Sequence, residues 1–271
     1  MAFKIKLNNG KMMKGIIETL SAIIDETTIK VTPEFFKIEA MDPSRICLLQ
    51  LTIKKENFDE YKCDKESLVP LNLSDFDKIL KRLSANESLE LEGDEKDNKI
   101  KIKMQKEGTK RPRSFSLALL DIDQENVPFE NLFKIEYPTR IEMKTLVLNE
   151  AIKDAEIYSE ILTLNAKPDV LRLSASGQIG EMEYQIDKDD LINYKTEKEE
   201  SGQYSLTFLK GIMRLSSITE NFNISMKTDH PIKLVFTLEN GAELNYFLAP
   251  RVEEAETSDE ESSAFADDFK E

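Results

Sequence analysis

Apolar positions along this chain follow a pattern that occurs twice. In the first copy the residues with helical spacing are Ile16, Ile17, Leu20 and Ile23, and 135 positions later stand Ala151, Ile152, Ala155 and Tyr158. The strand-like Phe36, Ile38 and Ala40 recur in the same way as Leu171, Leu173 and Ala175. A second helical stretch recurs after 132 positions, where Phe76, Lys78, Leu80, Arg82 and Leu83 become Phe208, Lys210, Ile212, Arg214 and Leu215. The chain therefore contains a duplicated unit, and repeat architectures usually work through a shared surface.

The first copy predicts an order of helix, strands, helix and strands. Helical spacing predicts helices over 11–25 and 74–84, the second with Ser74 as its N-cap. Alternating or continuous apolar runs predict the strands, which are 2–8, 28–31, 36–40, 46–53, 88–92, 98–104 and 113–120. The same order repeats from about 141 to 249. We expect an α+β fold of mostly antiparallel sheets, with two helices in each domain on one face.

The domain boundaries follow from the segments that fit neither period. Residues 121–134 are acidic, contain Pro128 and lie between the two copies, which is typical of a linker. We therefore expect an N-terminal domain over 1–120, the linker over 121–134, a C-terminal domain over 135–250 and an acidic tail over 251–271. The tail has few large apolar side chains with which to offset the entropy of ordering, so we expect it to be disordered.

Charge is unevenly distributed along the chain. The net charge is −15, and the tail contains nine acidic and two basic residues, which leaves −8 for the body. An acidic protein is a poor candidate for nucleic-acid binding on composition alone, because phosphates repel it. The placement of the basic residues must therefore decide whether the chain binds nucleic acid.

The reactive residue types argue against an enzyme. His230 is the only histidine, and Cys47 and Cys63 are the only cysteines. A cluster of His and Cys metal ligands cannot be assembled from these residues, and a Ser-His-Asp or Cys-His nucleophile pair is not expected. We expect no cofactor and no metal. The apolar runs are too short to span a membrane, and the N-terminus lacks the apolar segment of a signal peptide.

Basic residues lie off the apolar stripe of each predicted helix. Taken singly, each could belong to an ordinary solvated face. Their recurrence in the repeat favours a second interpretation, in which the helices form a basic surface that attracts a phosphate backbone while the rest of the chain repels it. The candidate residues are Lys11, Lys14, Lys78, Lys81, Arg82, Lys153, Lys210 and Arg214.

Two predicted strands have edges of opposite charge. A basic stretch over 106–113 leads into the alternating strand 114–120, whereas the predicted strand around Met182 is acidic. An exposed edge strand is an aggregation hazard unless it is paired, and opposite charges favour head-to-tail pairing between copies, which closes into a ring. Ordinary charged edges in a monomer remain the alternative. The candidate interface residues are Lys110, Arg113, Phe115, Leu117, Glu181, Met182, Glu183 and Tyr184.

Four short stretches are more specific than this pattern. They are Ala40-Met41-Asp42-Pro43-Ser44-Arg45, Leu119-Leu120-Asp121-Ile122-Asp123, Leu173-Ser174-Ala175-Ser176-Gly177, and Tyr246-Phe247-Leu248-Ala249-Pro250-Arg251-Val252-Glu253. Over about 1–254, in order and with few gaps, the chain closely resembles the proliferating cell nuclear antigen family, the sliding clamps of archaea and eukaryotes.

This resemblance implies a DNA sliding clamp: a trimeric ring around duplex DNA that confers processivity on DNA polymerase without being an enzyme. It places Lys14, Lys78, Lys81, Lys153, Lys210 and Arg214 on DNA-facing helices. It also implies a groove for partner peptides of the form Gln-x-x-aliphatic-x-x-aromatic-aromatic. The matching groove positions are Met41, Arg45, Ile46, Leu48, Val127, Pro128, Pro231, Phe247, Leu248, Ala249 and Pro250.

The partners implied by the resemblance are duplex DNA without sequence preference, other copies of the chain, DNA polymerase, clamp loader, flap endonuclease and DNA ligase. The location implied is the cytoplasm or nucleoid of an archaeal cell, or the nucleus of a eukaryotic cell. The alternative function is an acidic interaction module that sequesters a partner or mimics DNA without encircling it. That alternative predicts no basic face, which the recurring lysines and arginines argue against.

Overall fold

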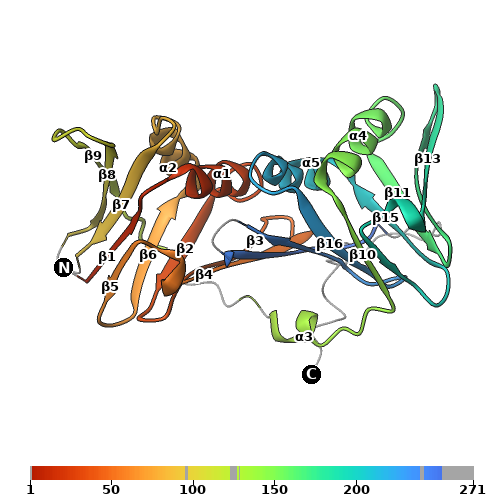
Figure 1. Ribbon diagram of the computed structural model, residues 1–271. Helices are drawn as coiled ribbons and strands as arrows, with labels where there is room; N and C mark the ends of the chain where they lie inside the picture. Colours follow the sequence, from red (N-terminus) through yellow and green to blue (C-terminus); the bar gives the residue numbers. More distant parts are fainter. Residues whose placement is uncertain (1, 95–96, 123–126, 128, 239–240, 252–271) are drawn as a thin grey trace. The chain divides into compact units, whose positions relative to one another are not determined.

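The two copies of the apolar pattern fold into corresponding elements. The computed structural model describes residues 2–251 apart from 95–96, 123–126, 128 and 239–240 (Figure 1). Helices α1 (Lys11–Leu20) and α4 (Thr145–Ala155) correspond, as do strands β3 (Phe35–Met41) and β12 (Val170–Gly177). Helices α2 (Leu73–Leu80) and α5 (Leu206–Ile212) form the second corresponding pair. The predicted duplication of helices and strands is confirmed.

The chain divides into two units, which we describe separately. Unit 1 contains residues 1–40, 49–126 and 237–244, and unit 2 contains residues 41–48, 127–236 and those from 245 onward. Each unit combines antiparallel strand pairs with two main helices. The predicted α+β class is therefore confirmed.

Unit 1 has two groups of strands. One sheet has the order β5-β1-β7-β8-β9, and every neighbouring pair is antiparallel. Its strands are β1 (Phe3–Leu7), β5 (Glu60–Cys63), β7 (Glu87–Gly93), β8 (Lys99–Lys106) and β9 (Arg113–Ala118). The other group has the order β4-β3-β2-β6, with β2 (Glu26–Val31), β4 (Cys47–Lys54) and β6 (Ser67–Asn72), and β4 has its first two residues in unit 2.

Unit 2 repeats this plan. Its four-stranded antiparallel sheet has the order β13-β12-β11-β15, with β11 (Ile161–Lys167), β13 (Gly180–Asp187) and β15 (Glu200–Ser205). A second group has the order β14-β10-β16-β17-β18. Its strands are β10 (Thr139–Lys144), β14 (Asn193–Lys195), β16 (Asn221–Met226), β17 (Ile232–Thr237) and β18 (Glu243–Leu248), the last two with residues in both units.

In each unit the helices bury an apolar stripe. Helix α1 packs against α2, which contacts β2, β6 and β9, and Met13, Ile16, Ile17 and Leu20 of α1 are fully buried. Helix α4 packs against α5 and the adjoining 3-10 turn Met213–Ser217, and α5 contacts β15. Burial of this stripe turns the polar positions of each helix outward.

Three expectations need correction. The first helix ends at Leu20 rather than near residue 25, and Ile23 lies half-buried in the turn that follows. The second helix spans Leu73–Leu80 rather than 74–84, so Arg82 lies in the turn after it. Its N-cap is Asn72 rather than Ser74: the Asp75 N–H donates to Asn72 Oδ1 over 3.0 Å. The linker is not entirely without regular structure, because 129–133 form helix α3 (Phe129–Phe133). The predicted disordered tail beyond Arg251 lies outside the described residues.

The cap assignment can be tested with two matched substitutions. Asn72→Ala removes the side-chain acceptor and should destabilise the protein by about 1 kcal/mol, the usual cost of a lost N-cap. Ser74→Ala lies inside the first turn and should change stability much less. Urea unfolding followed by circular dichroism measures both. An equal loss in the two variants would contradict the assignment of Asn72 as the cap.

Candidate functional site

The basic residues on the helices of unit 1 differ in how they are held. Lys11, Lys78, Lys81 and Arg82 are exposed, as predicted for a solvent-facing basic surface. Lys14 is half-buried, and its ammonium donates to the carbonyl of Leu83 over 3.0 Å and to that of Lys81 over 3.4 Å. Lys14 therefore binds carbonyl groups just after α2, where a positive charge is favourable.

Unit 2 also exposes basic residues, and two of them correspond to residues of unit 1: Lys210 to Lys78 and Arg214 to Arg82. Lys153 on α4, Lys210 on α5 and Arg214 in the following 3-10 turn are all exposed. The Lys210 ammonium is 2.7 Å from a Glu156 carboxylate oxygen. The recurrence seen in the sequence is thus a recurrence of outward-facing side chains on corresponding elements.

Local ion pairs divide these cations into two groups. Lys78 lies 2.8 Å from Asp75 and Lys81 lies 2.7 Å from Asp77, so both lysines, like Lys210, already have a carboxylate partner. Within the described residues, Lys11, Arg82, Lys153 and Arg214 are in no ion pair, and neither is Lys14, which is held by the two carbonyls instead. Exposed ion pairs are weak, so a phosphate could displace the carboxylates that pair with Lys78, Lys81 and Lys210. Lys11, Arg82, Lys153 and Arg214 could bind phosphate without first losing a carboxylate.

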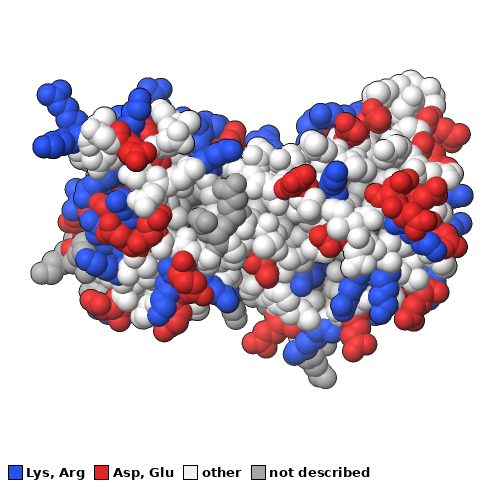
Figure 2. All heavy atoms as spheres, viewed as in Figure 1, with Lys and Arg blue, Asp and Glu red and all other residues white. Residues whose placement is uncertain are grey.

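The two predicted interface strands lie at sheet edges. Strand β9 is the last of its sheet in unit 1, and β13 is the last of its sheet in unit 2. Phe115 and Leu117 are partly buried on one face of β9, while Tyr184 of β13 is 41% exposed. Figure 2 shows basic side chains at the tip of the β8–β9 hairpin and acidic side chains on the part of unit 2 that carries β13.

The charge of Arg113 is directed into its own unit. Its guanidinium forms an ion pair with Glu87, whose side chain is 8% exposed, and donates to the carbonyl of Arg82 over 2.9 Å. The Ser84 N–H, which donates to Glu87 over 2.8 Å, and the nearby Arg113 charge hold the pKa of Glu87 below its usual range. The basic character of this edge therefore rests on the exposed Lys110 and Arg111 rather than on Arg113.

The predicted groove region belongs to unit 2, and its first wall is a tight turn. Asp42 is 3% exposed, and its Oδ1 accepts the N–H groups of Ile46 and Cys47 over 2.7 and 2.6 Å. Arg45 has a left-handed backbone (φ 55°), which the short turn between β3 and β4 requires. The turn carries Met41, Arg45 and Ile46 at the surface, and the carbonyl of Ile46 accepts the N–H of Ala249 over 2.9 Å.

The apolar centre of this region is covered rather than open. Leu48, Phe247 and Ala249 are 0%, 0% and 3% exposed, and they form one cluster with Val127, Phe129 and Leu132 of the linker. The ring of Phe133, itself 43% exposed, lies edge-on to Phe247 with centroids 5.4 Å apart. Three of the predicted groove residues, Leu48, Phe247 and Ala249, are therefore not open to solvent, because α3 packs on them.

The remaining groove residues lie in different surroundings. Leu248 alternates with Phe247 along β18, so it faces the opposite side and does not belong to the cluster. Pro231 is buried, and its carbonyl accepts the hydroxyl of Tyr137 over 2.9 Å. Pro250 is partly exposed beside Ala249, and Pro128 lies outside the described residues.

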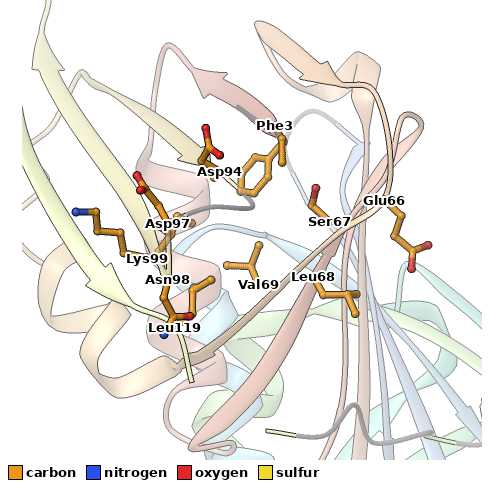
Figure 3. A pocket seen from close by; sticks show the side chains of 13 residues that line it. Phe3, Glu66, Ser67, Leu68, Val69, Asp94, Asp97, Asn98, Lys99 and Leu119 are labelled. Carbon is orange, nitrogen blue, oxygen red and sulfur yellow. The ribbon is translucent and has the colours of Figure 1, made fainter. Parts of the chain in front are cut away.

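A separate pocket of about 310 Å³ lies in unit 1, beside β1, β6 and the turn between β7 and β8 (Figure 3). Phe3 fits there only because residue 93 is glycine: a Cβ at that position would lie 2.2 Å from the ring. The Glu66 and Asp97 carboxylates beside the pocket are paired with Lys30 and Lys101, each over 2.9 Å. None of the residues predicted from the sequence to be functional lines this pocket.

The described residues offer little reactive chemistry. Burial raises the pKa of the Cys47 thiol, which keeps it protonated and a poor nucleophile. Among the residues described, no three His, Cys, Asp or Glu side chains are grouped so as to hold a metal ion. In the same part of the chain, no helix is long and apolar enough to cross a membrane.

Comparison with known proteins places this chain in a family. Residues 2–127 match the N-terminal domain of proliferating cell nuclear antigen, and residues 131–251 match its C-terminal domain. The DNA polymerase sliding clamps of Thermococcus gammatolerans and Pyrococcus horikoshii are each 32% identical to the chain, covering 94% of it and all of their own length. The clamp of Methanothermobacter thermautotrophicus is 30% identical with the same coverage.

The chain belongs to the proliferating cell nuclear antigen family. The resemblance carried by the four short stretches is confirmed. The alternative of an acidic module that sequesters a partner or mimics DNA is not supported by these matches.

The Glu87–Arg113 pair predicts a specific pH dependence of stability. Because the pKa of Glu87 is lower in the folded chain than in the unfolded one, its stabilisation is present above the unfolded pKa of about 4.3 and is lost as the pH falls through the folded pKa. Glu87→Gln should therefore be less stable than the wild type at pH 7, and the difference should shrink below about pH 4. Urea unfolding over this range measures it, with the exposed Glu107→Gln as control. A difference that stays constant with pH would contradict the assignment.

Proposed function

We propose that three copies of this sliding clamp close into a ring around duplex DNA, with the basic helix residues of both units facing the DNA. The observation that carries the proposal is the recurrence of the exposed Lys78 and Arg82 as the exposed Lys210 and Arg214 in an acidic chain. In a ring with a basic inner surface, DNA would be attracted to the hole and repelled from the outside. The ring acts as a non-enzymatic processivity factor, since its role is topological.

The chemistry of these residues suits sliding. Lysine and arginine contacts to phosphate fix a protein on DNA without reading the bases. Within the described residues, the cations without a recorded ion pair lie in both units, which allows contact with the backbone as the duplex moves. Binding should depend steeply on salt, because each phosphate contact releases counterions.

The DNA-facing surface can be tested with two sets of substitutions of equal charge. The triple variant Arg82→Ala, Lys153→Ala and Arg214→Ala should weaken association with duplex DNA. The slope of log K against log salt should become shallower by about 0.9 for each phosphate that is no longer neutralised. The weakening should be the same for unrelated DNA sequences, since these side chains carry no base information. Fluorescence anisotropy over a salt series measures both quantities.

The control variant removes three exposed lysines that lie off the helices, Lys54, Lys62 and Lys195. It changes the net charge by the same amount, so a pure net-charge effect would weaken binding equally in the two variants. Equal weakening, or weakening confined to one DNA sequence, would contradict a DNA-facing helix surface.

Ring closure would join β9 of one copy to β13 of the next. Both strands are sheet edges, and an edge has backbone groups that a second strand can pair with. Lys110 and Arg111 lie in the turn just before β9, and Glu181 and Glu183 lie on β13, so the two edges are complementary in charge. Phe115, Leu117, Met182 and Tyr184 would add apolar contacts.

A charge exchange within one chain tests this closure. Lys110→Glu with Arg111→Glu should leave single chains at micromolar concentration, and so should Glu181→Lys with Glu183→Lys, because like charges would then face each other across every interface. Combining all four substitutions should restore the trimer. Light scattering after size-exclusion chromatography gives the masses. Trimers in both double variants, or failure of the combined variant to reassemble, would place the interface elsewhere.

The surface of unit 2 around Met41, Ile46, Phe247 and Pro250 would dock partner peptides that place one aliphatic and two aromatic side chains in an apolar groove. DNA polymerase is the partner that the names of the relatives support. Clamp loader, flap endonuclease and DNA ligase are proposed on the family resemblance. Binding would rest on apolar burial and so depend only weakly on salt.

A further inference from the structure

Helix α3 covers the strand residues that would dock a partner peptide in the function proposed above. The cluster that buries Leu48, Phe247 and Ala249 is completed by Val127, Phe129 and Leu132 from the linker. Phe129 is 5% exposed and Leu132 is 0% exposed, so both side chains are packed inside the cluster. A peptide cannot place its own apolar side chains on these strand residues while Phe129 and Leu132 occupy the same space.

The side chains of α3 have the same chemistry as the peptide motif. Within five residues α3 provides one aliphatic side chain, Leu132, and two aromatic ones, Phe129 and Phe133. Phe129 and Phe133 lie with ring centroids 6.4 and 5.4 Å from that of Phe247, the second in an edge-on arrangement. The Lys233 ammonium lies 4.7 Å from the Phe133 ring centroid and 5.6 Å from that of Phe247, within cation–π range.

We propose that α3 is an internal ligand of the docking groove, and that a partner peptide binds only after α3 has left it. This inference rests on the proposed docking function of the same surface. It adds a competition: the affinity of the peptide is reduced by the fraction of subunits in which α3 occupies the groove.

The length of α3 makes the exchange feasible. Five residues are too few to form a stable helix alone, so α3 depends on its packing against the cluster. A peptide with one aliphatic and two aromatic side chains replaces that packing with similar contacts. Phe133 is 43% exposed, so displacement can begin at this end of α3, beside Lys233.

The first test measures peptide affinity with the groove left intact. The probe is a synthetic peptide of the form Gln-x-x-aliphatic-x-x-aromatic-aromatic, titrated calorimetrically into the full chain. Phe129→Ala with Leu132→Ala weakens the hold of α3 without touching the strands, and should tighten binding by about tenfold or more. Glu130→Gln, on the exposed side of α3, should leave the affinity unchanged. Unchanged or weaker binding in the double variant would overturn the proposal.

The second test needs no substitution in α3. Amide hydrogen exchange of residues 129–135 in the wild-type chain should become faster when the peptide is bound, because α3 is then released. If α3 were instead a wall of the groove, the peptide would cover it and exchange would slow, which would overturn the proposal even if the double variant failed to fold.

A groove variant separates this proposal from the docking function. Ile46→Asp should abolish peptide binding in the wild type and in the α3 double variant while leaving the oligomeric state unchanged. If the peptide still binds when Ile46→Asp is introduced into the wild type and into the α3 double variant, the docking site lies elsewhere. That result would overturn the proposed docking function and this inference with it. If Ile46→Asp abolishes peptide binding but the α3 substitutions do not tighten it, the docking function stands and only the proposed competition by α3 is overturned.

Discussion

Burial of one apolar stripe on each helix is the constraint on which the rest of the structure depends. Met13, Ile16, Ile17 and Leu20 of α1 are all fully buried. Each such side chain is worth about 1.5–3 kcal/mol relative to its exposed state, so α1 cannot rotate about its axis without losing several times the worth of a surface ion pair. The outward direction of Lys11 is therefore set by the core and not by its own charge. In unit 2 the burial of Ile152 and Ala155 fixes the direction of Lys153 in the same way.

The parts of the fold that follow a single period could be predicted from the sequence. Phe36 and Ile38 are buried and alternate with partly exposed residues, and so do Leu171 and Leu173. This alternation can be read from the sequence without tertiary information. The sequence alone predicts the wrong N-cap because both Asn72 and Ser74 carry suitable side-chain oxygens, and only the start of the helix decides between them. That start depends on where β6 ends, which the local pattern does not give.

The candidate site was less predictable, because its decisive contacts join residues distant in sequence. Arg113 looks like an edge cation in the sequence, yet Glu87 and the carbonyl of Arg82 turn it inward. Phe129, Leu132 and Phe133 have helical spacing, but Pro128 and the surrounding acidic residues suggested a linker. A helix of five residues gives too short a periodic signal, and only its packing against Phe247 makes it stable.

The two copies contribute different strands as the edges of the proposed interface. Lys78 and Arg82 recur as Lys210 and Arg214, whereas the two proposed interface edges are different strands of the repeat. Lys110 and Arg111 precede β9, the last strand of the first copy, and Glu181 and Glu183 lie on β13, which stands between the two helices of the second copy. Edges of unlike charge discourage pairing of β9 with another β9, or of β13 with another β13, since both place like charges together. Pairing between unlike edges is head-to-tail, and such an interface either closes into a ring or continues as a fibre. In the proposed ring, the unlike charges of the two edges select the pairing, and the geometry of the chain must then set the number of copies at which the ring closes.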